Sequence, residues 1–267
     1  MIGVFTDLDG SLLDEETYSF KEAQESLDLL KQKQIPLIIN TSKTVSEVLE
    51  IRTALRLSTP FIVENGAAIC FEEKPDGLET VEQVISNQRL YIHYCGLEYH
   101  KLIDIAEKIR SSHPFNFEGF NDMNINRVVE LTGLSQEDAH KAKQRLCSEP
   151  LLWQSSPEDL KAFEAELTKY NLYLTRGGRF FHIIGDYSKG KAYSIMKDLL
   201  KFDKTIGIGD GKNDISFLNK VNIAVIIPKK DGSHLEVSNS DTIIAPQPSP
   251  VGFNDGLNMA LRKITSG

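Results

Sequence analysis

Residues 2–11, with the sequence IGVFTDLDGS, contain the pattern that decides the fold. The apolar run 2–6 predicts a short buried strand, and a segment with two carboxylates follows it directly. Helices and strands are then expected in alternation, at 21–34, 35–40, 45–57 and 61–63. This β-α-β-α-β order, with strands that are apolar throughout, is typical of a parallel sheet covered by helices on both faces.

The C-terminal part of the chain repeats this alternation, whereas the middle does not. Helices are expected at 191–200 and 214–218, and strands at 205–209, 223–227 and 242–244. Between them, helical stretches alternate with short strands, and a hairpin is expected around Gly177-Gly178 because paired glycines suit a tight turn. We therefore predict an α/β fold, a doubly wound, mostly parallel, Rossmann-like sheet formed by residues 1–96 and 186–267, with an inserted α+β domain at 97–185.

The composition excludes several classes of protein. The chain has 267 residues and a net charge of -8, which disfavours a nucleic-acid-binding role because such proteins usually need a positive surface. No apolar run approaches the roughly 20 residues that span a bilayer, and the N-terminus does not resemble a secretory signal. Three cysteines without a Cys-x-x-Cys pair argue against a disulfide framework. We expect a cytoplasmic protein that binds no membrane, and the sequence leaves its oligomeric state open.

Four aspartates follow strands that are expected to lie in one sheet. Asp7 and Asp9 come after the first strand, while Asp210 and Asp214 come after the strand at 205–209. Ligands bind at the carboxyl edge of such sheets, so the four side chains are expected to converge on one cleft. Together they need a hard cation, and oxygen ligands with room for water favour Mg²⁺. Taken alone, the first pair fits a solvated turn equally well.

Two other stretches each allow two interpretations. Residues 40–44, NTSKT, offer hydroxyl groups and a lysine at a helix N-terminus, which suits an anion site, but taken alone they fit an ordinary N-cap better. Residues 185–192, GDYSKGKA, nearly match a nucleotide-binding P-loop, but Ala192 stands where the metal-binding hydroxyl is required. A nucleotide-binding protein that uses Gly185 to Lys191 therefore stays open as an alternative.

In this order, the motifs Asp7-x-Asp9, Thr41, Lys189 and Gly209-Asp210-x-x-Asn213-Asp214 resemble those of haloacid dehalogenase-superfamily phosphatases. The resemblance implies that the inserted domain is a type IIB cap. It also implies that Asp7 is the nucleophile, that Asp9 is the acid and base, and that Thr41 and Lys189 bind phosphate. Mg²⁺ would be held by Asp7, Asp9 and Asp210, with Asp214 bound directly or through water.

Six further blocks of sequence resemble mannosyl-3-phosphoglycerate phosphatases. They lie at 40–44, 64–67, 119–123, 131–134, 148–150 and 177–180. The resemblance implies a small phosphorylated sugar as substrate, mannosyl-3-phosphoglycerate first, with glucosyl-3-phosphoglycerate or a broader range of sugar phosphates as alternatives. Arg179 could bind a carboxylate or could simply be an exposed hairpin residue. The predicted substrate-binding residues are Ser42, Lys43, Gly178, Arg179 and Asn213.

Overall fold

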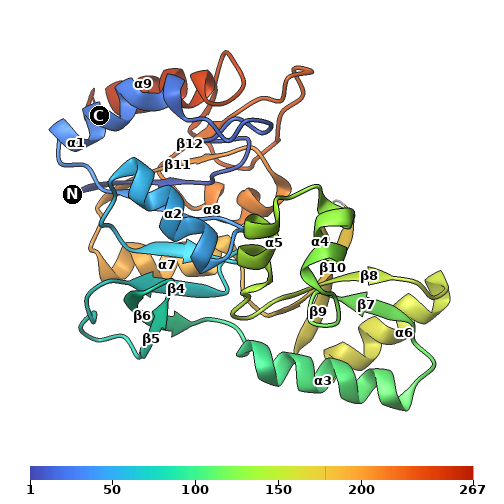
Figure 1. Cartoon of the computed structure of the whole chain (residues 1–267). Coiled ribbons are helices and arrows are strands. Elements are labelled where there is room, and N and C mark those ends of the chain that lie inside the picture. The colour runs from blue at the N-terminus through green and yellow to red at the C-terminus, as the bar shows by residue number, and fades with distance from the viewer. Residues whose placement is uncertain (178, 267) are drawn as a thin grey trace. The chain divides into compact units, whose positions relative to one another are not determined.

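The computed structural model describes residues 1–177 and 179–266, and these form two compact units (Figure 1). The first unit comprises residues 1–42, 57–71 and 188–267, and the second comprises residues 43–56 and 72–187. The second unit contains the segment 97–185 that is predicted to be an inserted domain. It also includes a helix and a hairpin from the N-terminal part of the chain. None of the described helices is long and apolar enough to cross a membrane.

A five-stranded parallel sheet forms the centre of the first unit. The strand order is β13-β12-β11-β1-β2. The chain passes from β1 to β2 on one side and from β11 to β12 and β13 on the other, so the sheet is doubly wound and the predicted fold class is confirmed. The strand bounds are β1 Ile2–Thr6, β2 Leu37–Ile39, β11 Lys204–Gly209, β12 Ile223–Ile226 and β13 Thr242–Ile244. An antiparallel pair, β3 Phe61–Val63 and β4 Ala68–Phe71, follows β2 in the chain.

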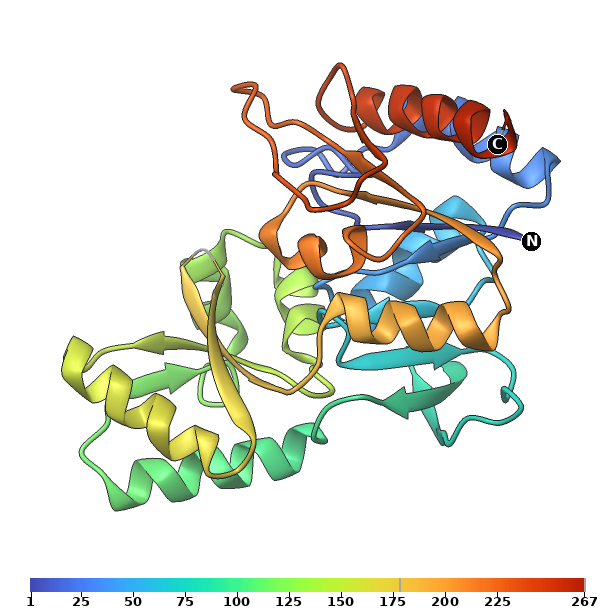
Figure 2. The same ribbon diagram turned by 180° about the vertical axis from the view of Figure 1, so that it is seen from behind.

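Helices cover both faces of this sheet, which explains why its central strands are almost wholly apolar and buried. One face is covered by α1 (Gln24–Gln32) and α9 (Val251–Ser266), which lie side by side in both views (Figures 1 and 2). The other face is covered by α7 (Lys189–Leu199) and the short α8 (Ile215–Leu218). Two 3₁₀ turns precede helices in this unit, η1 at Lys21–Ala23 and η2 at Lys212–Asp214.

The second unit contains an antiparallel sheet with the strand order β7-β8-β10-β9. Its strands are β7 Phe117–Gly119, β8 Glu149–Trp153, β9 Leu172–Gly177 and β10 Phe180–Gly185. The hairpin β5 Val81–Ile85 and β6 Gln88–Tyr94 also belongs to this unit. Its helices are α2 Val45–Leu55, α3 Tyr99–Ser112, α4 Ile125–Thr132, α5 Gln136–Lys143 and α6 Pro157–Thr168.

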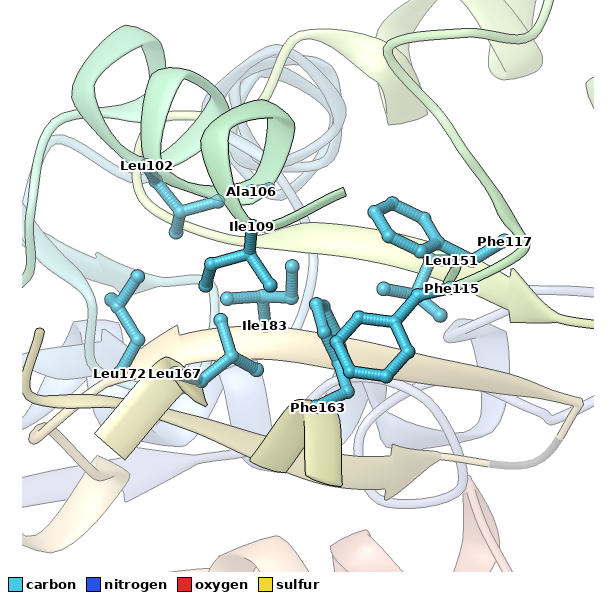
Figure 3. Packing of buried hydrophobic residues seen from close by; sticks show 10 residues of the cluster. All are labelled: Leu102, Ala106, Ile109, Phe115, Phe117, Leu151, Phe163, Leu167, Leu172 and Ile183. Carbon is cyan, nitrogen blue, oxygen red and sulfur yellow. The ribbon is translucent and has the colours of Figure 1, made fainter. Parts of the chain in front are cut away.

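A hydrophobic cluster holds α3 and α6 against this sheet. Figure 3 shows Ile109 of α3 and Leu167 of α6 pointing toward Ile183 of β10, with Phe163 beside Phe115. Phe115 and Phe163 pack edge to face with their ring centroids 5.6 Å apart, a favourable arrangement for two aromatic rings. The second unit therefore has a hydrophobic core of its own.

The structure corrects several predicted element boundaries. The helix expected at 21–34 is a 3₁₀ turn followed by a shorter helix, and the strand at 61–63 is confirmed without change. Helices α4 and α6 and the β5–β6 hairpin were not predicted individually. They are short and depend on packing against neighbouring elements. The predicted glycine hairpin joins β9 to β10, but Gly178 lies outside the described residues.

Candidate active site

The candidate site begins where two neighbouring strands end. β1 and β11 pair in parallel with Thr6 opposite Ile208, and the Asp7 N–H group donates to the Ile208 carbonyl oxygen over 3.0 Å. Asp7 directly follows β1 and Asp210 directly follows β11, so both lie at the same edge of the sheet. The chain also diverges in opposite directions at this pair of strands, which is where ligands bind in doubly wound folds.

Three of the four predicted aspartates form a tight cluster. Asp7, Asp210 and Asp214 each offer a carboxylate oxygen, and these oxygens lie within 4.8 Å of one another. Asp7 and Asp214 are buried and Asp210 is partly buried. Burial and the negative charge of Asp7 together raise the pKa of Asp210 to about 6. The cluster thus concentrates negative charge where little water can reach it.

Lys189 is the cation at the centre of this cluster. Its Nζ atom lies 2.9 Å from Asp7 Oδ2 and 2.6 Å from Asp214 Oδ1, and its side chain is fully buried. Burial alone lowers the pKa of Lys189, but the adjacent Asp214 and Asp7 carboxylates outweigh it and raise the pKa. The lysine is therefore held in its charged form beside the carboxylate that ends β1.

The backbone around Lys189 is fixed by two polar residues. Ser188 caps α7 by accepting the Lys191 N–H group. The Asn40 side chain donates to the Lys189 carbonyl oxygen over 3.2 Å. Because Asn40 directly follows β2, it ties the start of α7 to the same sheet edge.

Asp214 is committed to lysine and backbone contacts. Its Oδ2 atom accepts the N–H groups of Asp210 at 3.0 Å and Gly211 at 2.9 Å, while Oδ1 accepts from Lys189. Burial and the nearby Asp7 charge raise its pKa. These contacts make Asp214 the residue that holds the loop after β11 and orients Lys189.

Gly10 and Ser11 fix the position of Asp210. Gly10 has a φ angle of +72°, and a Cβ atom there would lie 2.6 Å from Asp210 Oδ2. Only glycine therefore suits this turn, for both conformational and steric reasons. The Ser11 hydroxyl donates to Asp210 Oδ1 over 2.8 Å, so the loop after β1 positions the carboxylate that follows β11.

The donor set of this cluster fits a hard divalent cation. Three carboxylates surround one ammonium group, which leaves two negative charges unmatched when all three acids are ionised. All the ligands offered are oxygen atoms, which Mg²⁺ and Ca²⁺ prefer. Because Asp214 already accepts three hydrogen bonds, Asp7 and Asp210 are the two carboxylates best able to bind such an ion.

Thr41 lies at the same edge of the sheet, after β2. Its N–H group donates to the Ile62 carbonyl oxygen and its carbonyl oxygen accepts the Asn65 N–H group. The Asn65 side chain in turn accepts from the Asn213 amide over 3.0 Å. Thr41 and Asn213, two predicted site residues, are thus linked through Asn65. The N-cap of α2 is Thr44, which forms a capping box with Glu47, so capping does not account for Thr41.

The remaining predicted residues lie outside the cluster of three carboxylates. Asp9 is partly buried, and its backbone forms an isolated β-bridge with Leu13. Ser42 is partly buried at the end of the segment that contains Thr41. Two predicted substrate-binding residues belong to the second unit: Lys43, whose Nζ lies 3.9 Å from Glu47, and Arg179, exposed in the turn before β10. Gly178 lies outside the described residues.

Ser11, Asn40 and Asn65 contact the site but were not predicted as site residues. Each is a small polar residue directly beside a predicted motif or strand end. The sequence feature that could have identified them is a polar side chain near the end of an apolar strand. The residue that each of them contacts, however, lies in a distant part of the chain.

The second unit holds a separate buried carboxylate, Glu149. Its Oε1 atom accepts the Asn121 N–H group at 2.8 Å and its Oε2 atom accepts the Tyr99 hydroxyl at 2.7 Å. Burial raises the pKa of Glu149 to about 7, although these two hydrogen bonds and Arg145 oppose the shift. Burial also lowers the pKa of the neighbouring strand residue His182 to about 4, aided by the charge of Arg145.

The geometry does not support the P-loop alternative. The strand before the lookalike segment, β10, pairs antiparallel with both of its neighbours, whereas a P-loop follows a strand of a parallel sheet. Lys191 is exposed, and Lys189 is the lysine that faces carboxylates. A phosphate-rich nucleotide would have to displace a buried ion pair at this point.

Comparisons with known proteins agree with this geometry. A family profile described as haloacid dehalogenase-like hydrolase matches residues 4–239. A glucosyl-3-phosphoglycerate/mannosyl-3-phosphoglycerate phosphatase from Persephonella marina is 38% identical over 99% of this chain and 98% of its own. A protein of the same name from Methanococcoides burtonii is 35% identical over 95% of both chains. A solved phosphatase of the same superfamily from Bacteroides thetaiotaomicron has a TM-score of 0.63 at 16% identity, covering 99% of this chain and 95% of that one.

Proposed function

Because this chain belongs to the haloacid dehalogenase-like hydrolases, we propose that it is a Mg²⁺-dependent phosphatase of glucosyl-3-phosphoglycerate and mannosyl-3-phosphoglycerate. The observation that carries the proposal is the position of Asp7. Asp7 directly follows β1, and its carboxylate lies beside Asp210 and 2.9 Å from the Lys189 ammonium group. This arrangement provides a nucleophile, a metal site and a phosphate-binding cation at one sheet edge.

Asp7 and Asp210 would hold the magnesium ion, with the Asp9 backbone carbonyl as a third ligand. Bound there, the ion supplies positive charge that reduces repulsion between a carboxylate nucleophile and a phosphate dianion. Ser11 and Gly10 keep Asp210 in place for this purpose. Asp214 contributes indirectly, because it orients Lys189 and the loop that carries Asp210.

Asp7 acts as the nucleophile. One carboxylate oxygen forms a bond to phosphorus while the bond between phosphorus and the ester oxygen breaks, which yields an aspartyl phosphate and an alcohol. The Leu8 N–H group donates to Asp7 Oδ1 over 2.8 Å and fixes the rotation of this carboxylate. Water then attacks phosphorus, and the Asp7 carboxylate is released together with inorganic phosphate.

Asp9 serves as the general acid and base. It gives a proton to the departing ester oxygen in the first step and removes a proton from the attacking water in the second. One carboxylate cannot be both nucleophile and acid at once, so the reaction needs two. Asp9 lies two residues beyond Asp7 and retains some exposure to solvent, which suits a proton-transferring group.

Lys189 and Thr41 bind the phosphate oxygens. The ammonium group is buried and keeps its charge, so it stabilises negative charge at phosphorus with little loss to solvent screening. The backbone contacts of Thr41 with Ile62 and Asn65 hold that residue rigidly at the same edge. Both residues position the phosphoryl group for in-line attack.

The substrate assignment rests on the two curated relatives, each of which is named as a phosphatase of both sugar phosphates. Glucosyl-3-phosphoglycerate and mannosyl-3-phosphoglycerate differ in one sugar hydroxyl configuration, so a site that accepts one need change little to accept the other. We further propose that residues 97–185 form the cap that determines substrate range and that the phosphoryl-transfer chemistry resides in the first unit.

The experiment is phosphate release from both sugar phosphates with purified protein and MgCl₂. We expect turnover of both substrates, loss of turnover when a chelator removes the metal, and a decrease in kcat on the order of 10⁴-fold or more for Asp7→Asn. Lys191→Ala provides the matched control. Lys191 is exposed near the N-terminus of α7, which also carries Lys189, so this variant should leave turnover unchanged.

Circular dichroism must show that Asp7→Asn is folded. Full activity in folded Asp7→Asn would exclude the nucleophile assignment. ATP hydrolysis that is lost in Lys191→Ala would instead support the nucleotide alternative. If neither sugar phosphate releases phosphate while other phosphate monoesters do, the substrate assignment fails but the phosphatase chemistry stands.

A further inference from the structure

A pocket opens beside Asp210 in the first unit, at the carboxyl edge of the five-stranded sheet. It is a small hollow that opens to solvent, and the volume available in it to the centre of a water molecule is about 10 Å³. Its lining comes from the loops after four strands, namely β1, β11, β12 and β13. Its charged lining residues are two lysines, Lys229 and Lys230, and two acids, Glu15 and Asp210, and Gly10 lies beside them. Since Gly10 and Asp210 also belong to the candidate active site, this pocket adjoins that site.

Two adjacent lysines line this pocket, and they differ in their ionic contacts. Lys230 forms an ion pair with Glu16 at 2.7 Å and a longer one with Asp14 at 4.0 Å. Lys229 is exposed and, within the described residues, forms no ion pair shorter than 4.0 Å, although its charge acts on the nearby carboxylates of Asp210 and Asp231. Lys229 is thus the cation of the pocket that is available to a ligand.

The backbone of Lys229 is nonetheless held firmly. Its N–H group donates to the Ser233 carbonyl oxygen at 2.8 Å, and its own carbonyl oxygen accepts the Gly232 N–H group at 2.9 Å. Asp231, the nearest acid in sequence, accepts the N–H and O–H groups of Ser233. The turn therefore presents Lys229 from a fixed point, which reduces the entropy lost when a ligand binds.

The chemistry of the substrate indicates what this lysine would bind. The phosphate already has Lys189 and Thr41, so a second cation near the site calls for a second anion. In a 3-phosphoglycerate derivative, the carboxylate carbon is separated by one carbon atom from the carbon that bears the phosphate. We infer that Lys229 recognises the glycerate carboxylate of the substrate. This inference rests on the proposed function and specifies which part of the substrate the first unit recognises.

The experiment compares two substrates that differ only in this group. They are glucosyl-3-phosphoglycerate and 2-O-glucosylglycerol 3-phosphate, in which a CH₂OH group replaces the carboxylate. For Lys229→Met we expect kcat/KM to fall about 10- to 100-fold on the carboxylate substrate, the range for losing a hydrogen bond to a charged group. On the alcohol analogue the decrease should stay below about 3-fold. Lys229→Arg should recover most of the activity, because it restores a cation that can bind a carboxylate.

Lys230→Met is the matched control, since it removes the same charge from the neighbouring position. It should change kcat/KM by less than about 3-fold on either substrate. Inhibition by the product glucosylglycerate gives a second measurement that needs no phosphate, and its inhibition constant should rise in Lys229→Met by a similar factor.

Equal losses on the two substrates in Lys229→Met, or equal effects of the two lysine variants, would overturn the inference and indicate only a general attraction of anions. Wild-type turnover of both substrates with either of these outcomes leaves the proposed phosphatase function intact. Failure of the wild-type protein to release phosphate from either substrate would instead refute the substrate assignment from which this inference starts.

Discussion

At the scale of single residues, Lys189 has two roles that can be separated. It neutralises buried Asp7 and Asp214 in the folded protein, and in the proposed reaction it also binds phosphate. Removing one partner of a buried ion pair leaves charge without compensation. We therefore expect Lys189→Met to lower the free energy of unfolding by about 3–5 kcal/mol in urea titrations of the metal-free protein.

The control for this prediction is Lys191→Met, which lies two residues away on the same helix but is exposed. It should change the free energy of unfolding by no more than about 0.5 kcal/mol. A Lys189→Met protein as stable as the wild type would show that the two acids are already protonated without the lysine. The ion pair would then not contribute to the stability of the fold.

The sequence predicted the acids of the site but not the residues that position them. Asp7, Asp210 and Asp214 stand directly after strands or at a helix start, so their convergence follows from local pattern and the geometry of a parallel sheet. Ser11 and Asn40 are ordinary residues in the sequence, and their roles depend on contacts across about 200 and 150 positions of the chain. Such pairings become visible only when the chain is folded.

At the scale of elements, the contact between α7 and α8 depends on Gly190. A Cβ atom at this position would lie 2.1 Å from the Ser216 backbone carbonyl oxygen, and the Gly190 N–H group donates to the Ser216 hydroxyl at 3.0 Å. Gly190→Ala should favour the helix by about 1 kcal/mol but cost more through the clash with fixed backbone. We expect a net loss of about 1–3 kcal/mol of stability.

Because Lys189 is the preceding residue, a displaced α7 should also lower phosphatase activity in Gly190→Ala. Lys191→Ala reports the helix propensity alone and should be neutral or slightly stabilising. Thermal unfolding and phosphate release measure the two effects separately. A stable, fully active Gly190→Ala protein would mean that α7 and α8 can separate without moving the site.

Element prediction succeeded where one pattern suffices and failed where packing decides. The central strands of the parallel sheet are short apolar runs, because helices bury both of their faces, and so β1, β11 and β12 were anticipated to within one residue. In contrast, α6 was not predicted, although its N-cap Ser156, the capping box and Pro157 are local features typical of a helix start. Its inward face is defined by the cluster around Phe163, which no local pattern reveals.

At the scale of the whole molecule, two buried groups of the second unit contribute to the pH dependence of stability. Glu149 has a folded-state pKa of about 7 against an ordinary value of 4.5, because it is buried. Between these values the folded protein keeps a proton that the unfolded chain has lost, so stability falls as pH rises. His182, with a folded-state pKa of about 4, has the opposite effect and makes stability rise between about pH 4 and 6.5.

Comparison with Glu149→Gln isolates one of these contributions, since every other group titrates in both proteins. As pH rises from 5 to 7, the free energy of unfolding of the wild type should fall relative to that of Glu149→Gln by about 2 kcal/mol. Glu166→Gln is a control of opposite sign at lower pH: its hydrogen bond with Lys169 lowers the pKa of Glu166 from its ordinary 4.5, so the wild type should gain stability over that variant as pH rises toward 4.5. Urea titrations at several pH values measure both differences.

A pH-independent difference between the wild type and Glu149→Gln would contradict the prediction. Glu149 would then ionise as readily in the folded protein as in the unfolded chain, which means that its contacts with Tyr99 and Asn121 and the charge of Arg145 fully offset its burial.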